Sequence, residues 1–139
     1  PQQQENMLVF CCSCPLMPIA WLIGKILKTD IFDKSNPLGN VGFLFTCNQF
    51  LYLLIVMWVF SAVPDKMAMV YAMVFGAHLL PYSWLYRSIN YRVFSIIIPI
   101  VSLVIGCMFS AFWVAVTLLI AEIIFVIALF VELHKFCNK

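Results

Sequence analysis

Charged side chains are scarce in this sequence. They make up 10% of its 139 residues, whereas 65% of the residues are hydrophobic. A soluble globular domain typically has about a quarter of its residues charged. The apolar surface of this chain is too large to bury inside a globule of its size, so lipid must cover part of it. The sequence therefore predicts an integral membrane protein.

The sequence also lacks the motifs of several functional classes. It contains no Walker pattern, no GxGxxG and no HExxH, and serine or carboxylate catalysis has no recognisable motif. The net charge is only +2 and no polybasic run occurs, so neither nucleic acid nor anionic headgroups are predicted as electrostatic partners. No signal peptide is visible, and a chain that begins at Pro1 is expected to have lost or omitted residues upstream. No cofactor is identified.

Five segments are long and apolar enough to cross a bilayer, which takes about 20 residues. They cover approximately residues 7–27, 41–63, 67–86, 91–109 and 112–131. Residues 93 to 131 carry no charge except at Glu122, so charge does not mark a boundary between the last two segments. Gly106 and Ser110 are taken as the turn signals that separate them. The longest connection, residues 28–40, contains turn formers and is predicted to be a loop. The predicted fold is one all-α domain, a bundle of five transmembrane helices.

The positions of the basic residues predict the orientation of the bundle. With five spans, seven of the eight fall on one side: Lys25, Lys28, Lys34, Arg87, Arg92, Lys135 and Lys139. Only Lys66 falls on the other side. Lys and Arg in short loops prefer the cytoplasmic side. The amino terminus is therefore predicted outside and the carboxyl terminus in the cytoplasm.

Two ionisable residues lie near the middle of predicted spans, His78 in the third and Glu122 in the fifth. A charged group at the centre of a membrane helix costs roughly 2.5 to 3.5 kcal/mol on insertion scales, so such residues are functional candidates. Both residues have a similar predicted depth, and we expect them to meet. Purely structural pairing is one interpretation, and participation in binding or proton movement is the other.

Further polar groups lie at a comparable depth. Asn48 and Gln49 in the second span are expected to join the cluster, either as ligand-binding groups or as hydrogen bonds that hold the bundle together. In the third span, Tyr71 and Tyr82 share a helical face with His78 and are expected to wall the site. These residues complete the predicted ligand-binding set.

Two stripes of small residues predict close helix packing. Ala68, Ala72 and Gly76 form a small-xxx-small ridge on another face of the third span. In the fourth span, Ser95, Pro99, Ser102 and Gly106 recur at helical spacing, and this stripe is expected to face protein or water rather than lipid.

Six cysteines occur, three of them in the run CCSC at residues 11–14. Cys11 and Cys14 have the C-x-x-C spacing of thiol redox pairs, which would suit an enzyme that passes electrons to a quinone. The alternative is that cysteine serves as a small apolar residue in a membrane helix. Zinc is not predicted, because His78 and His134 are too far from the cluster to complete four ligands.

Two stretches, NPLGNVGFLFTCNQFLYLLIVMWVF at 36–60 and VFGAHLLPYSWLY at 74–86, are similar to a family of small, functionally uncharacterised bacterial multi-pass membrane proteins. The resemblance covers mainly the second and third spans. It implies the bacterial inner (plasma) membrane and supplies no activity. The motif positions present in this chain are Asn48, Gly76, His78, Pro81 and Tyr82.

The preferred function is binding or transport of a small solute or ion, with Glu122 as the negative or protonatable partner and His78 as its proton-sharing neighbour. Five spans are few for a transporter acting alone, so transport implies a homodimer. The second hypothesis is a non-catalytic membrane subunit or assembly protein that uses the ridge of Ala68, Ala72 and Gly76 as its interface. A thiol–quinone oxidoreductase is the third, which makes an enzyme the less favoured class. Membrane lipids are expected partners in each case.

Overall fold

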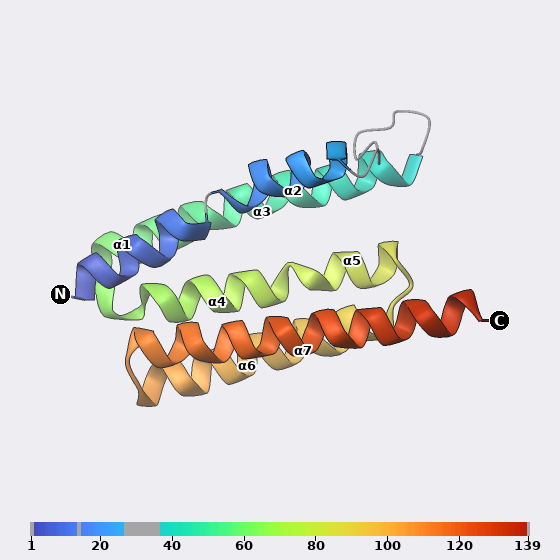
Figure 1. Ribbon diagram of the computed structural model, residues 1–139. Helices are drawn as coiled ribbons and strands as arrows, with labels where there is room; N and C mark the ends of the chain where they lie inside the picture. Colours follow the sequence, from blue (N-terminus) through green and yellow to red (C-terminus); the bar gives the residue numbers. More distant parts are fainter. Residues whose placement is uncertain (1, 14, 27–36, 139) are drawn as a thin grey trace.

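The chain folds into long helices that run back and forth along one axis, as the computed structural model in Figure 1 shows. The structure describes residues 2–13, 15–26 and 37–138, and it contains no strand within these ranges. The elements are α1 (Gln2–Ser13), α2 (Leu16–Ile26), α3 (Pro37–Ala62), η1 (Pro64–Lys66), α4 (Met67–Ala77), α5 (Leu79–Leu85), α6 (Ile89–Met108) and α7 (Ala111–Cys137).

Four helical stretches are long and apolar enough to cross a membrane: Leu38–Ala62, Pro64–Leu85, Ile89–Met108 and Ala111–Cys137. They match the second to fifth predicted spans, so the prediction of an all-helical chain with several helices of membrane-spanning length and hydropathy is confirmed. The predicted first span, 7–27, is instead two helices that are interrupted at Pro15. At about 1.5 Å per residue, neither α1 nor α2 alone reaches across a hydrocarbon core of about 30 Å.

The second span begins earlier than predicted. Residues 37–40 were expected in a loop, yet α3 starts at Pro37. Proline suits the first position of a helix, because its fixed φ is helical and no hydrogen bond is required of its nitrogen there. The remainder of the predicted loop, 28–36, lies outside the described residues.

The boundary between the fourth and fifth spans falls at residues 109–110, where the prediction placed it, and Ser110 is the N-cap of α7. Gly106, however, is not part of the turn, so its use as a turn signal is wrong. It lies inside α6, where a Cβ atom would come within 2.4 Å of Met69 Cγ on α4. Glycine at this position permits close packing of two helices.

The third span is interrupted at His78, which separates α4 from α5. Pro81 has no N–H to donate to the carbonyl group of Ala77, four residues earlier. The loss of this helical hydrogen bond accounts for the break. His78 therefore lies at an irregular point of the span, although α4 and α5 together are still long enough to cross.

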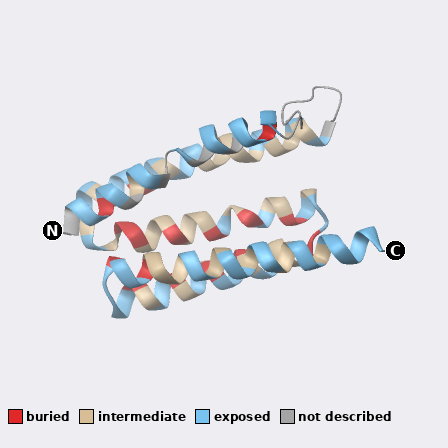
Figure 2. Ribbon diagram, in the orientation of Figure 1, coloured by how far each residue is buried: buried red, intermediate tan, exposed pale blue. Residues whose placement is uncertain are grey.

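The tightest part of the bundle lies between α4 and α6, which make the most extensive contact of any two elements. Ala68 and Ala72 are 4% and 1% exposed, and Gly76 is also buried. On α6 the serine stripe is buried too, at Ser95 and Ser102. The packing role of both stripes is thus confirmed. Figure 2 shows these buried positions in red, in contrast to the mostly exposed α2.

Polar contacts fasten both ends of α6. At the end of the bundle that holds η1, Lys66 Nζ donates to the carbonyl oxygen of Gly106 over 2.8 Å. At the other end, the Glu132 carboxylate accepts from Ser88 Oγ at 2.6 Å, from Asn90 Nδ2 at 2.7 Å and from the Ile89 N–H at 3.3 Å. A cation near a helix C-terminus and an anion near a helix N-terminus both stabilise the helix.

Candidate functional site

A cavity of about 380 Å³ lies between α1, α4 and α7. Two of its lining residues come from α1, four from α4 and five from α7. Most of these side chains are apolar. The polar groups are the carboxylate of Glu122, the hydroxyl of Tyr71 and the thiol of Cys12. The predicted residues Tyr71 and Glu122 therefore share one cavity.

Glu122 has no partner among the residues that the structure describes. It is half-buried, and its carboxylate makes no hydrogen bond or ion pair with any of the described residues. Its position on α7 is eleven residues after Ala111, which corresponds to about 16 Å along the helix. The acid thus faces an apolar cavity about halfway along α7, and the described lining residues include no countercharge.

Contacts of Asn6 and Phe10 contribute to holding the wall formed by α1. Asn6, 0% exposed, donates from Nδ2 to the carbonyl oxygen of Pro64 in η1. One turn further along, the Phe10 ring packs edge-on against Tyr71 with a centroid distance of 6.5 Å. These contacts place Leu8 and Cys12 at the cavity. No side chain that the structure describes in α2 is among the lining residues.

The cavity is open on one side. Leu8 of α1 is 65% exposed and Leu119 of α7 is 57% exposed, although both line the cavity. The cavity is therefore open to the surface near these two apolar side chains.

His78 and Tyr82 belong to a second cluster. His78 Nδ1 is hydrogen-bonded to the carbonyl oxygen of Phe75, and its ring packs edge-on against both Phe75 and Tyr82. The expected direct contact between His78 and Glu122 is absent. Phe75 belongs to both groups, because it also lines the Glu122 cavity. His78 and Glu122 do not meet because His78 lies at the helix break, where its ring bonds to a carbonyl group of its own helix rather than reaching towards α7.

Tyr82 connects α5 to α3. Its hydroxyl lies 2.7 Å from Thr46 Oγ1 and 3.3 Å from the carbonyl oxygen of Gly42. The ring also stacks on Tyr86 at a centroid distance of 5.9 Å. Partial burial raises the pKa of the Tyr86 phenol, and the neighbouring Tyr82 adds to this shift, so the phenol stays protonated at neutral pH. Tyr82 thus joins helices and does not line the Glu122 cavity.

Asn48 and Gln49 of α3 are half-buried. Neither residue lines the Glu122 cavity, and neither side chain makes a hydrogen bond within the part of the chain that the structure describes. The structure therefore does not bring these amides together with Glu122. The predicted six-residue set is divided into one cavity, one aromatic cluster and two separate amides.

The cysteines are divided in a similar way. Cys11 and Cys12 are exposed free thiols of α1, and Cys12 lines the cavity. Cys14, the second member of the predicted redox pair, lies outside the described residues. No group of three or more histidine, cysteine or acidic side chains is placed to hold a metal ion in the described ranges.

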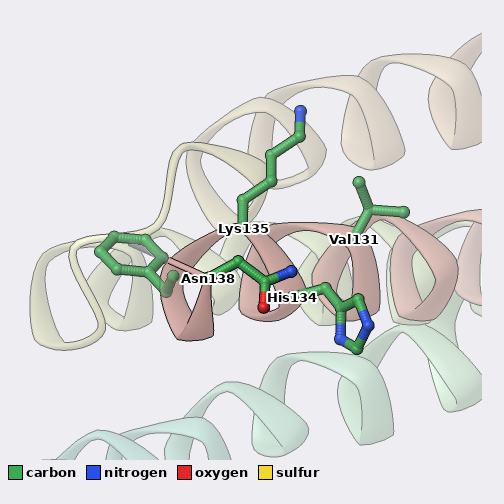
Figure 3. A pocket seen from close by; sticks show the side chains of 5 residues that line it. Val131, His134, Lys135 and Asn138 are labelled. Atoms are coloured by element: carbon green, nitrogen blue, oxygen red, sulfur yellow. The ribbon is translucent and has the colours of Figure 1, made fainter.

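A second hollow, of about 570 Å³, lies at the end of α7, where Figure 3 shows Val131, His134, Lys135 and Asn138. All of its described lining residues come from the last two turns of this one helix, and they are exposed. In Figure 3 the Lys135 and His134 side chains extend in opposite directions from the helix. This hollow is an open surface at a helix end and does not gather polar groups around a common point.

Sequence reasoning missed the parts of the site that depend on helix neighbours. Phe75 lies between Tyr71 and His78 on the same predicted face, so its periodicity was a usable signal. Leu8 gave no signal, because apolar residues are common throughout the chain. The partners of Glu132 and of Lys66 were also missed, since both side chains contact residues about 40 or more positions away.

The chain belongs to a family of unknown function, DUF7010, whose match covers residues 1–132. The predicted relation to an uncharacterised family is thereby confirmed. No curated protein and no solved structure matches the chain.

Proposed function

We propose that this member of a family of unknown function binds a small organic solute inside the membrane, in the cavity that contains Glu122. The observation that carries the proposal is the carboxylate itself. It lies midway along a membrane-length helix, faces a cavity and has no partner among the described residues. Maintaining such a group costs free energy, which a bound partner offsets.

The size of the cavity supports a molecule rather than a few waters. Ligand pockets in proteins typically have volumes of about 300 to 1,000 Å³ and apolar walls with a few polar groups. The cavity of about 380 Å³ has this composition. Its lateral opening between Leu8 and Leu119 supports entry from the lipid. Movement of the solute across the membrane would require the cavity to open on both sides in turn, and binding is the first step of such transport.

We also propose five spans, with α1 and α2 together as a broken first span, in a bacterial inner membrane. Figure 1 supports this arrangement, because α1 and α2 follow each other along the length of α3, and the two termini lie at opposite ends of the bundle. The amino terminus is then outside. Lys66, the single basic residue on the outer side, has a structural reason to be there in its hydrogen bond to Gly106.

The subunit hypothesis loses its proposed interface. The ridge of Ala68, Ala72 and Gly76 is covered within the bundle, because a Cβ atom at Gly76 would come within 2.5 Å of Pro99 Cδ on α6. The ridge thus packs against α6 at Gly76 and lines the cavity at Ala68 and Ala72, so it offers little outer surface for a partner protein. Solute binding is the better supported function.

The proposal is tested with a variant that fills the cavity, Ala115→Leu. Ala115 lines the cavity and is half-buried, whereas Ala77 on α4 is exposed, so Ala77→Leu is a control that adds the same volume elsewhere. Thermal unfolding of the purified protein in detergent is measured with lipophilic amines, acids, neutral aromatics, quinones and phospholipids. At least one compound is expected to raise the melting temperature of the native chain and of Ala77→Leu, but not of Ala115→Leu. The proposal is wrong if no compound stabilises the native chain, or if the cavity-filling variant responds equally.

A further inference from the structure

We infer that the solute is a lipophilic organic cation, for example a protonated or quaternary amine with an aromatic or hydrocarbon body. This inference rests on the proposed function and specifies the chemical class that the same cavity selects. It follows from the polarity, the aromatic content and the shape of the lining.

The charge of the ligand follows from what the lining lacks. Glu122 is the one strongly acidic group at the cavity, and no lysine, arginine or histidine is among its described lining residues. Lys66 is hydrogen-bonded to Gly106, and His78 is hydrogen-bonded to the carbonyl oxygen of Phe75. A bound anion would meet repulsion, and a neutral hydrocarbon would leave the carboxylate without a partner. A cation supplies the missing countercharge.

An inorganic cation does not suit the lining. Calcium takes six to eight oxygen ligands, and magnesium takes six. The described lining residues offer one carboxylate, one phenol and one thiol, and their other side chains are apolar. The described residues also contain no acidic or histidine cluster that could complete a coordination shell. A cation with its own hydrocarbon covering avoids this deficit, because it needs no oxygen shell.

The aromatic walls favour the same class of ligand. Tyr71 and Phe75 lie one helical turn apart on α4, and both line the cavity together with Glu122. The negative face of an aromatic ring attracts a cation, most strongly where water is excluded. Phe75 is held by its ring contact with His78, with a centroid distance of 5.1 Å, and Tyr71 by Phe10. The rings are therefore positioned before a ligand arrives.

The lateral opening fits a ligand that partitions into lipid. Because Leu8 and Leu119 flank the opening, a ligand approaches Glu122 along an apolar surface. An organic cation with a hydrocarbon body concentrates in the membrane, with its charge near the headgroups. The hydrocarbon body then contacts the leucines of α7, and the charged group reaches the carboxylate.

The inference is tested with three ligands that share a benzyl body and differ in charge: benzyltrimethylammonium, its neutral carbon analogue neopentylbenzene, and phenylmethanesulfonate. Dissociation constants are measured by titration calorimetry on the full chain in detergent, and Ala115→Leu provides the blank for partition into micelles. The cation is expected to bind about tenfold or more tightly than its neutral analogue, the scale of one desolvated charge pair. Glu122→Gln is expected to abolish this preference while it retains binding of the neutral analogue.

Asp65→Asn is the matched control, because Asp65 is an exposed acid of η1 and its loss changes the net charge equally. This variant is expected to keep the preference for the cation. Phe75→Leu retains apolar volume and removes one ring face, and it is expected to weaken binding of the cation more than that of the neutral analogue. This variant tests the inference independently if Glu122→Gln does not fold.

Equal binding of the cation and the neutral analogue would overturn the inference and leave solute binding intact, since the cavity would then select for shape alone. Tighter binding of the sulfonate, or a preference for the cation that survives in Glu122→Gln, would overturn it as well. Absence of binding by all three ligands would also overturn it, and the broader set of compounds tested with Ala115→Leu would then decide whether the cavity binds anything.

Discussion

The interface between α4 and α6 and the wall that α1 adds to the cavity are built in opposite ways. Between α4 and α6, small residues bring the two helices so close that Gly76 has no room for a methyl group. In the α1 wall, by contrast, Asn6 is bonded to η1 and Phe10 packs against Tyr71, while Leu8 stays largely exposed. One side of the cavity is thus formed by α4, which packs closely against α6. The other side is formed by α1, whose lining residue Leu8 is largely exposed.

This difference has a functional consequence for the candidate site. Membrane helices associate through packing and hydrogen bonds rather than through the hydrophobic effect, so the number of close contacts largely determines how easily a helix moves. Tyr71 and Phe75 belong to α4, which packs closely against α6, so their positions are fixed. The opening lies beside α1, which packs less closely. Ligand entry is expected to displace α1 more than α4.

The largest effect is expected from a methyl group in the tight interface. In Gly76→Ala, the added carbon would lie 2.5 Å from Pro99 Cδ and 2.7 Å from Ile98 Cγ2, so the helices must separate. Overpacking of this kind costs about 1 to 3 kcal/mol of unfolding free energy. The measurement is unfolding of the purified protein in detergent, followed by circular dichroism.

Gly42→Ala is the control for this prediction. A Cβ atom at Gly42 meets only the end of the Leu85 side chain, Cδ2, at 3.2 Å, and this side chain can rotate away. The free energy of unfolding is expected to change by less than about 0.5 kcal/mol, the usual range for sites without a special feature. Equal losses in the two variants would show that α4 and α6 do not form the tight interface.

A smaller effect is expected where the tight pair is fastened at the η1 end. Lys66→Met removes the donor to the carbonyl oxygen of Gly106, one of the last carbonyl groups of α6, where helical partners run out. Loss of this hydrogen bond is expected to cost about 1 kcal/mol. Hydrogen exchange at the amides near the end of α6 should accelerate. Lys135→Met, at an exposed lysine of α7, is the control, and faster exchange there at the same amides would contradict the prediction.

The smallest effects are expected from two acids of α7 that differ in their partners. Glu132→Gln loses the charge that accepts hydrogen bonds from Ser88 and Asn90, and because the site is mostly solvated the expected cost is about 0.5 to 1 kcal/mol. Glu122→Gln, without ligand, is expected to leave the melting temperature unchanged or to raise it. No protein partner is lost there, and a neutral amide is easier to bury than a carboxylate.

Melting temperatures of the two variants, measured side by side in the same detergent, check this prediction. The pair is informative because substitution and helix are the same in both. If Glu122→Gln destabilised the protein more than Glu132→Gln, then Glu122 would have a structural partner inside the bundle. The cavity would in that case lose its unpaired acid, and with it the main reason to expect a ligand.

Part of the site was predictable because it depends on one helix at a time. The depth of Glu122, its isolation from other charges in the chain and the aromatic face that contains Tyr71 all follow from spacing along the sequence. Its neighbours did not follow. His78 was expected to meet Glu122 because both have a similar depth, but depth does not fix the direction in which a side chain leaves its helix. The break at His78 changed that direction.

The sequence by itself determined that this chain forms long apolar helices, four of them long enough to cross a membrane, and it placed Ser110 between the last two and the small residues at helix contacts. Length, hydropathy and the positions of glycine and proline are properties of a single segment. They determine whether that segment can form a membrane-spanning helix, independently of the neighbouring helices. Only the tertiary structure decided that α1 borders the cavity with Glu122, that His78 and Tyr82 belong to another cluster, and that the first predicted span forms two helices. The physical reason is that such contacts depend on the rotation of each helix about its own axis, which packing against several neighbours sets and no single segment encodes.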